Sequence, residues 1–255
     1  MRFASLGSGS RGNALVVEAG RTRVMLDCGF SLSDIQLRLS RLQLLPSDLS
    51  AILVTHEHSD HVGGVARFAR KFALPVWLTA GTLKSLPSDT FNGISVQLID
   101  DHSTFAISDL EIQPYPVPHD AREPVQYVFG DGAHQLGVLT DVGASTPHIE
   151  ATLRGCHALV LESNHDSAML RDGSYPPFLK QRVAGKFGHL NNEDAARLLS
   201  VLAHGKLQHV VAAHLSEKNN RPDLVRTAFG NALNCEEDWI VIAEQEGGTE
   251  WLEVV

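Results

Sequence analysis

The chain has 255 residues, a formal net charge of −9 at pH 7 and a sequence pI near 5.8. This length is enough for a large hydrophobic core, and no linker-like, repetitive or low-complexity segment divides the chain, so residues 1–255 are expected to form a single domain. The acidic balance excludes a broad basic surface for long duplex nucleic acid, but it leaves open a phosphodiester substrate bound through metal ions.

The chain carries no sign of a membrane or secretory segment. Its first apolar run is too short for a signal peptide, and no stretch approaches the roughly 20 apolar residues of a membrane span. We therefore expect a soluble, cytoplasmic protein without a membrane partner. Cys28, Cys156 and Cys235 are few, odd in number and far apart, which predicts buried thiols in a reducing compartment.

Two strands are predicted over residues 2–6 and 14–18, joined by a loop of glycines and short polar residues. Such a loop can present backbone N–H groups and hydroxyls to an anion. An ordinary hairpin turn is the alternative, because glycine and serine are common in turns. The candidate anion contacts are Ser8, Ser10 and Asn13.

The next predicted strand, residues 22–27, ends in Asp27 just before Gly29. An acid in this place can hydrogen-bond a neighbouring metal-binding loop. A helix then begins at Ser31 or Ser33 and runs to about Gln43.

Residues 52–64, ILVTHEHSDHVGG, carry the strongest functional signal. Apolar residues predict a buried strand, after which His56, His58, Asp60 and His61 follow within six positions. Side chains two apart in an extended segment leave on the same side, so His56 and His58 can hold one ion, while Asp60 and His61 lie where the chain turns and can face a second. A solvated histidine-rich loop is the alternative, and four ligand-type residues between a strand and glycines make it the weaker one.

Strands and helices alternate through the middle of the chain. A helix is predicted over residues 65–72, strands over 75–78 and 94–116, and a hairpin over 125–140. His119 follows one of these strands, and Asp141 ends the second strand of the hairpin.

A helix beginning at Thr146 precedes a buried strand over residues 157–162, which opens into a polar cluster containing Asn164 and His165. His189 stands just ahead of a helix capped by Asn191 or Asn192, a setting that favours anions such as phosphate. A histidine in an ordinary capping loop remains the alternative. The predicted apolar face of this helix contains Ala196, Leu199, Val201 and Leu202.

The last segment contains a strand over residues 209–213 followed by His214. A helix from Pro222 to about Asn234 comes next. Residues 239–243 and 251–254 are predicted to close the chain as a hairpin.

The motif HxHxDH at residues 56–61 resembles the signature of the metallo-β-lactamase-fold hydrolases. The resemblance implies an α/β protein, an αβ/βα four-layer sandwich with a dinuclear metal centre at one sheet edge. It implies one metal on His56, His58 and His119 and another on Asp60, His61 and His214. It also implies that Asp141 bridges the metals and that Asp27 supports the ligands from behind. No long insertion separates Asp141 from His214, so the β-CASP domain of larger nucleases is not expected.

Residues 6–13, 161–166 and 188–192 resemble the YycJ/WalJ branch of this family, related to the RNase Z and PhnP phosphodiesterases. The branch implies a phosphodiesterase, or a 5′-to-3′ DNA exonuclease, that uses a hydroxide between two divalent ions; Zn²⁺, Mn²⁺ and iron all suit the ligands. It implies that the substrate is a nucleic acid or a small phosphodiester. Catalytic roles are expected for Asp60, His189 and His165, either histidine being the proton donor to the leaving group. The expected substrate contacts are Ser8, Ser10, Asn13, Asn164, His165, His189 and Asn191.

Two alternatives remain at this stage. A hydrolase of a small thioester, lactone or cyclic phosphate would use the same metals with a narrower cavity, and the acidic composition favours it. A non-catalytic or redox member of the fold is the other, and the complete ligand set without a flavodoxin-like extension argues against it.

Overall fold

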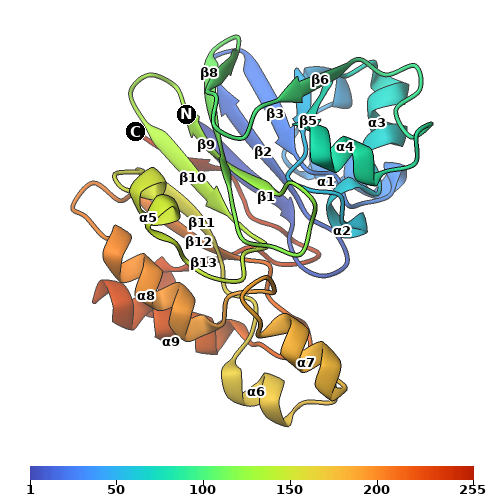
Figure 1. Cartoon of the computed structure of the whole chain (residues 1–255). Helices are drawn as coiled ribbons and strands as arrows, with labels where there is room; N and C mark the ends of the chain where they lie inside the picture. The colour runs from blue at the N-terminus through green and yellow to red at the C-terminus, as the bar shows by residue number, and fades with distance from the viewer.

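Two β-sheets of seven strands each face one another in the computed structural model, which describes residues 1–255 (Figure 1). The first sheet contains β1 Arg2–Gly7, β2 Ala14–Ala19, β3 Thr22–Leu26, β4 Ala51–Leu53, β5 Val76–Thr79, β6 Val96–Ile99 and β14 Leu252–Glu253. The second contains β7 Phe105–Ile107, β8 Leu110–Pro116, β9 Val125–Gly130, β10 Gln135–Leu139, β11 Ala158–Glu162, β12 His209–Ala213 and β13 Val241–Ile242. The strand orders are β14-β1-β2-β3-β4-β5-β6 and β13-β12-β11-β10-β9-β8-β7.

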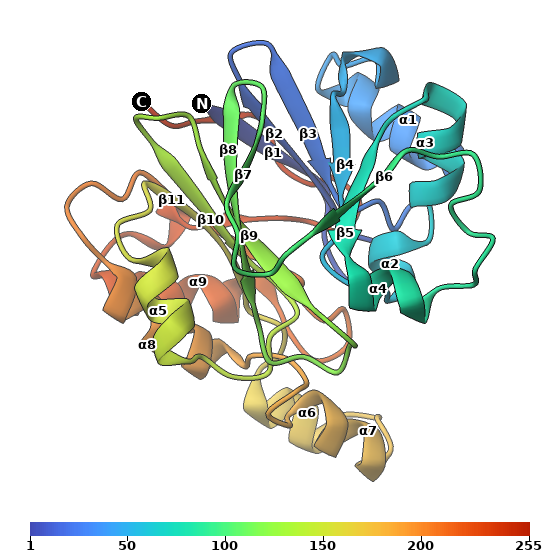
Figure 2. The ribbon, with the colours of Figure 1, turned by 45° about the horizontal axis from the view of Figure 1, so that its top comes forward.

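Helices cover the outer face of each sheet, which gives four layers (Figures 1 and 2). Beside the first sheet lie α1 Leu32–Arg41, α2 Ser59–Val62, α3 Val65–Phe72 and α4 Ala80–Ser85. Beside the second lie α5 Pro147–Leu153, α8 Asn192–Leu202 and α9 Pro222–Leu233, while α6 Ser167–Asp172 and α7 Pro177–Val183 project beyond the sheets. Two 3₁₀ turns, η1 Pro46–Asp48 and η2 Glu237–Trp239, complete the elements. The predicted α/β sandwich is therefore confirmed.

Three apolar clusters hold the layers together. Because successive strand residues point to opposite faces, Phe3 enters the cluster between the sheets and Ala4 enters the one beneath α1 and α3. Phe129 reaches the middle cluster from the second sheet, and Leu199 of α8 lies in the third. The single domain over residues 1–255 stays a prediction, which this shared middle cluster supports.

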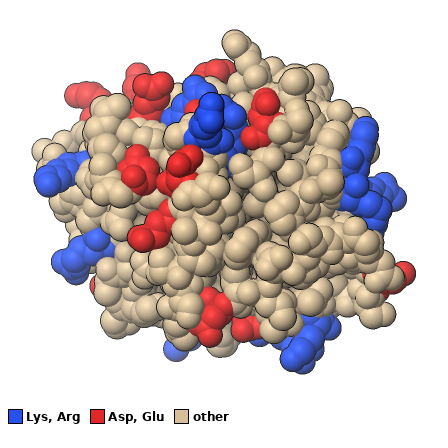
Figure 3. Space-filling view, turned by 90° about the horizontal axis from the view of Figure 1, so that it is seen from above, with Lys and Arg blue, Asp and Glu red and all other residues tan.

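The parallel strands direct the chain toward one edge. β3, β4, β5 and β6 are parallel neighbours, as are β10, β11, β12 and β13, so the segments that follow them leave each sheet at its carboxyl-end edge. The opposite end of the molecule, which carries the termini, displays scattered acidic and basic side chains (Figure 3). No helix has the length and apolarity needed to cross a bilayer.

The predicted closing hairpin is wrong. β13 pairs with β12 in the second sheet, whereas β14 pairs with β1 in the first, so the two strands separate after a single bridge between Glu244 and Gly248. The alternation of apolar residues predicted both strands, but it cannot say which sheet edge each will join. Residues 244–248 instead cross between the sheets beside the loop at residues 8–13, where Gln245 Nε2 donates to Gly12 O at 2.9 Å and Ser8 N donates to Glu244 O at 3.2 Å.

Other predictions differ in detail. Val201 is 46% exposed, and Ala195 and Leu198 occupy the buried face of α8 in its place. α6 and α7 lie in a segment for which no helix was predicted, because α6 buries one side chain, α7 buries none, and neither has an apolar stripe. Cys28 and Cys156 are buried thiols as predicted, but Cys235 is only half-buried.

One buried hydrogen bond joins the two sheets next to the histidine-rich loop. Tyr127 of β9 is fully buried, and its hydroxyl donates to Val54 O at 2.9 Å, immediately after β4. A buried carbonyl without a donor is costly, so this bond both stabilises the interface and fixes the start of the loop that carries His56.

We expect Tyr127→Phe to lower the free energy of unfolding by about 1–3 kcal/mol, because Val54 O would be left without a partner. Urea unfolding measures this change. Tyr175→Phe is the matched control, since Tyr175 is half-buried and its hydroxyl has no hydrogen bond in the structure. Equal stability of the two variants would mean that the bond contributes nothing.

Candidate metal centre

Imidazoles and carboxylates from six separate segments meet at the edge where the parallel strands end. One comes from the last residue of β11, and the others come from the segments that follow β4, β8, β10, α7 and β12. Four groups of these side chains bring their ligand atoms within 4.8 Å of one another and could each hold a metal ion. The groups are His56, His58 and His119; His56, His61 and Asp141; Asp60, His61 and His214; and Asp141, Glu162, His189 and His214.

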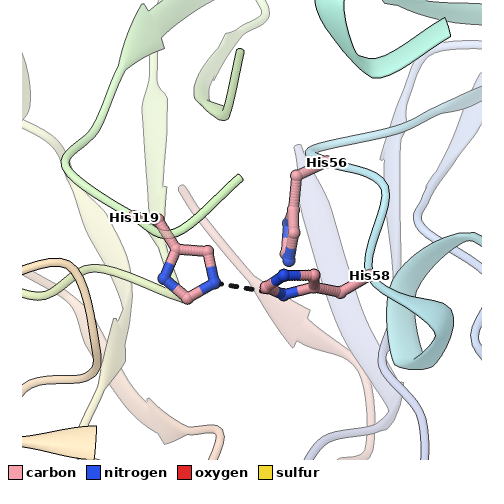
Figure 4. Close-up of side chains that lie close together, drawn as sticks. All are labelled: His56, His58 and His119. Atoms are coloured by element: carbon pink, nitrogen blue, oxygen red, sulfur yellow. Dashed lines mark hydrogen bonds between the residues drawn. The ribbon is translucent and has the colours of Figure 1, made fainter. Parts of the chain in front are cut away.

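The first predicted ligand set, His56, His58 and His119, forms a compact triad (Figure 4). Ring centroids lie 4.5 Å apart for His56 and His58, and 5.0 Å apart for each pair with His119. The Nε2 atom of His119 faces the Nδ1 atom of His58 at 3.3 Å. Two imidazole nitrogens at this separation can both act as ligands of one ion, so the triad has the form of a three-histidine site.

The second predicted set, Asp60, His61 and His214, lies beside it. Oδ2 of Asp60 is 3.5 Å from Nε2 of His61 and 3.5 Å from Nε2 of His214. Asp141 stands between the two sets, with Oδ2 3.1 Å from His61 Nε2 and Oδ1 3.9 Å from His119 Nε2. The structure therefore brings all seven predicted metal ligands together.

The outer partners of the rings determine which nitrogen can bind a metal. His61 Nδ1 lies 2.7 Å from Asp27 Oδ2, His119 Nδ1 lies 3.1 Å from Gly188 O, and His214 Nδ1 lies 3.2 Å from Glu162 Oε1. Carboxylates and carbonyls only accept hydrogen bonds here, so in the neutral ring, the form that binds a metal, each Nδ1 carries the hydrogen and each Nε2 directs its lone pair to the centre. The Nε2 atom of His61 also lies 3.1 Å from Asn13 Nδ2.

The same reasoning extends to His56 through Thr55. The Thr55 hydroxyl donates to Asp27 Oδ2 at 2.8 Å, so it can only accept from the Nδ1 of His56, 2.9 Å away. Asp27 also accepts from Thr55 N at 2.8 Å. Asp27 thus lies behind the ligands, as the resemblance implied, and orients the rings of His61 and His56.

Several inward-facing atoms have no partner within the protein. His56 Nε2, His214 Nε2 and Asp141 Oδ2 are buried without a hydrogen bond. Lone pairs left unsatisfied in a buried site cost free energy, and all three converge on one small volume. Imidazole nitrogens and carboxylate oxygens are ligands of divalent cations, so this donor set fits divalent metal binding.

The pKa shifts of the clustered side chains also indicate a site for positive charge. Burial lowers the pKa of His56, and its imidazole neighbours lower it further. Burial also lowers the pKa of His214, but Asp141, Asp60 and Glu162 outweigh it and raise this pKa to about 10. Burial raises the pKa of Asp141, yet the charges of His214 and His61 hold it well below its ordinary value. The carboxylates therefore stay ionised and attract positive charge into the centre.

Glu162 is a site residue that the sequence analysis missed. It is fully buried at the end of β11, where Oε1 lies 2.7 Å from His189 Nδ1 and 3.2 Å from His214 Nδ1. Its Oε2 accepts from Val142 N at 3.0 Å and Leu190 N at 3.2 Å. Burial raises the pKa of Glu162, but His189 and His214 lower it to about 2. The sequence feature that could have identified Glu162 is its position as the acidic last residue of an otherwise apolar strand.

A cavity of about 360 Å³ opens onto the centre, and only three of its fifteen lining residues are hydrophobic. Among the predicted substrate contacts, Ser10, Asn164 and His189 line it. Burial lowers the pKa of His189, but the adjacent Glu162 carboxylate raises it above its ordinary value. The bond to Glu162 occupies Nδ1, so Nε2 is the nitrogen left for the cavity.

Other predicted contacts lie elsewhere. Ser8 and Asn13 are buried behind the ligands: Ser8 Oγ accepts from His214 N at 2.9 Å, and Asn13 Nδ2 lies 3.3 Å from Asp60 Oδ2. His165 is 1% exposed and does not line the cavity, and Asn191 caps α8 by accepting from Asp194 N. These side chains hold the site together without facing its open space.

Comparison with known proteins places this geometry in context. The family described as the beta-lactamase superfamily domain matches residues 22–214. The exodeoxyribonuclease YycJ of Bacillus anthracis is 36% identical over 240 residues, 91% of this chain and 89% of that protein. The exodeoxyribonuclease WalJ of Streptococcus pneumoniae is 31% identical over 236 residues, with 91% and 88% covered. A diphosphatase of the PhnP family superposes with a TM-score of 0.71 at 18% identity, over 99% of this chain and 97% of that one, and has the same fold.

We expect Glu162→Gln to lower divalent-metal affinity about 10- to 100-fold, measured by competition with a chromophoric chelator. A glutamine amide turned toward His189 and His214 offers N–H groups, which would make a ring Nδ1 the acceptor and transfer its hydrogen to Nε2. Glu193→Gln, on the exposed first turn of α8, is the matched control and should bind metal normally. Unchanged affinity in Glu162→Gln would exclude this positioning role.

Proposed function

The chain belongs to the β-lactamase superfamily, and within it to the family of the YycJ and WalJ exodeoxyribonucleases; from this premise we infer that it is a metal-dependent hydrolase that cleaves phosphodiester bonds in DNA. One structural observation carries the step from family to chemistry. His189, held by a buried carboxylate, shares a polar cavity with the candidate metal ligands. A histidine so placed can deliver a proton to an alkoxide leaving group.

We propose two divalent ions at this centre, one on His56, His58 and His119 and the other on Asp60, His61 and His214, with Asp141 shared between them. Imidazole-rich ligation suits Zn²⁺, and the mixed carboxylate set also accepts Mn²⁺ or iron. Bound there, the cations would supply a nucleophile at neutral pH and would neutralise charge on the phosphoryl oxygens. Asp60 lines the cavity and would take part in catalysis by holding the ion of its set.

The remaining chemistry belongs to the protein. Glu162 fixes the His189 ring through Nδ1, so Nε2–H can donate to the oxygen that departs from phosphorus. We assign this role to His189 in preference to His165, because His165 does not reach the cavity. Asn164 and Ser10 line the same space and can hydrogen-bond a phosphate.

The competing function is hydrolysis of a small thioester, lactone or cyclic phosphate. It would use the same ligands, and the net charge of −9 favours a small substrate over a long nucleic acid. The polar lining of the cavity argues for phosphate, because an acyl substrate would gain from apolar walls. Turnover of a thioester or lactone, with every DNA and RNA left intact by the metal-loaded protein, would replace the proposal with this alternative.

Removal of metal should abolish hydrolysis. Dialysis against a chelator is expected to eliminate cleavage of end-labelled DNA, and added Zn²⁺ or Mn²⁺ should restore it. Elemental analysis of protein purified without added metal should give close to two equivalents per chain. One equivalent or none, persisting after reconstitution, would rule out the dinuclear arrangement.

Replacement of His189 by alanine tests the proton donor. General acid catalysis typically contributes about 10²- to 10⁴-fold, so kcat on DNA should fall by roughly that factor. Turnover of bis-p-nitrophenyl phosphate should fall far less, because p-nitrophenolate leaves without needing a proton.

The metal content of His189→Ala should stay unchanged, since His189 is not among the proposed ligands. Equal losses on both substrates would reduce His189 to a positioning residue, and loss of metal would make it a ligand.

A further inference from the structure

The segment of residues 167–188, here called the helical arm, contains α6 and α7 and the link to His189. It stands out from the two sheets in both ribbon views (Figures 1 and 2). Four of its side chains, Tyr175, Leu179, Arg182 and Val183, line the cavity in front of the metal centre. The arm is therefore both a wall of the site and an extension of it away from the protein body.

The charge of the arm is opposite to that of the whole chain. The protein has 30 acidic and 21 basic residues, yet the arm carries four basic side chains, Arg171, Lys180, Arg182 and Lys186, against a single acid, Asp172. A positive segment on an acidic protein, next to a site for phosphodiesters, matches the charge of a nucleic-acid strand.

The arm also holds the exposed phenylalanines of the chain. Phe178 is 71% exposed and Phe187 is 62% exposed, whereas the other eight of the ten phenylalanines are buried or half-buried. Phenylalanine is normally buried, so two exposed rings close together in the sequence indicate a surface that binds another molecule. Aromatic faces among basic side chains are what single-stranded nucleic acid binds by stacking and by charge.

Contacts with the site fix the base of the arm. His189 N donates to Val183 O at 2.8 Å, and Asp120 N donates to Phe187 O at 3.0 Å. Arg182 Nε donates to Asp120 Oδ2 at 2.6 Å, next to the candidate ligand His119. A nucleic-acid strand that leaves the cavity along α7 would therefore meet an arm whose base is held in a fixed position.

We propose that the helical arm binds the single-stranded part of a DNA substrate, with unpaired bases stacked on Phe178 and Phe187 and phosphates contacted by Lys180 and Lys186. This inference rests on the proposed phosphodiesterase function and adds a preference for unpaired ends. Bases in a duplex stack on one another and leave no face for the rings. A second copy of the chain is the poorer occupant, because a symmetric contact would bring two positive arms together.

The test compares the aromatic variant, Phe178→Ala/Phe187→Ala, with the matched control Leu37→Ala/Leu98→Ala, whose side chains are 70% and 59% exposed and do not line the cavity. The substrates are a short end-labelled oligothymidylate, the same length as blunt duplex, and bis-p-nitrophenyl phosphate, all with the metal-loaded protein. We expect KM for the oligothymidylate to rise in the aromatic variant by at least about 5- to 150-fold, the effect of losing one of the two base stacks, while the control stays at the wild-type value.

Charge is tested separately with Lys180→Ala/Lys186→Ala against Lys84→Ala/Lys206→Ala. Log affinity for a phosphorothioate oligothymidylate, which resists cleavage, should depend less steeply on log salt in the arm variant, by about 0.7 for each phosphate contact removed. The control should keep the wild-type slope.

The outcomes separate the two proposals. No turnover of any phosphodiester by the wild-type protein would overturn the proposed function itself. Wild-type cleavage of DNA with unchanged KM in the aromatic variant would overturn the role of the arm alone. Equal losses on oligothymidylate and bis-p-nitrophenyl phosphate would mean that the rings support the cavity. If the wild-type protein is a dimer and the aromatic variant is a monomer, the arm is a contact between copies. Either result overturns the inference.

Discussion

The burial of charged and lone-pair groups around one small volume is the constraint on which the rest of the structure depends. His61, His214, Asp141 and Glu162 are almost inaccessible to water, and such groups are stable only when each hydrogen and each lone pair finds a partner. Asp27, Glu162, Thr55 and a backbone carbonyl supply the outer partners. On the inner face His56 Nε2, His214 Nε2 and Asp141 Oδ2 have no hydrogen-bond partner within the protein, which is why the arrangement fits a cation. Fold and site are thus parts of one hydrogen-bonding scheme.

The backbone adapts to this scheme at three places. Asp27, Asp141 and His214 have φ values of 59°, 52° and 56°, in the left-handed region, and each lies within two residues of a strand end. Aspartate and histidine tolerate this region better than most residues, at a cost of order 1 kcal/mol each. The sharp turn aims each side chain back across the edge of the sheet toward the other ligands. The sheets can hold these conformations because both faces of each sheet are closely packed, which keeps the strands rigid.

Sequence patterns predicted most of the strands and helices and the histidine-rich loop, because strand alternation and helical periodicity are local properties, whereas the four-layer arrangement came from the family resemblance. His56 and His61 lie within one short segment, so their proximity followed directly. The meeting of Asp141 and His214 with that loop did not follow from spacing, since sequence separation carries no distance, and only the family resemblance joined them. Glu162 was missed because its role depends on partners from two distant segments. The destinations of the last two strands were missed because each joins a different sheet.

The crossing at residues 244–248 has a consequence for the order of assembly. It closes over the loop that carries Asn13, and Gln245 and Gly12, which it joins, are 233 residues apart in the chain. During synthesis the ribosome releases the loop long before residues 244–248, so one side of the centre stays unsupported in the nascent chain until they emerge. Residues 244–248 therefore act as a latch, and the loop beside the centre gains this support only after they have left the ribosome.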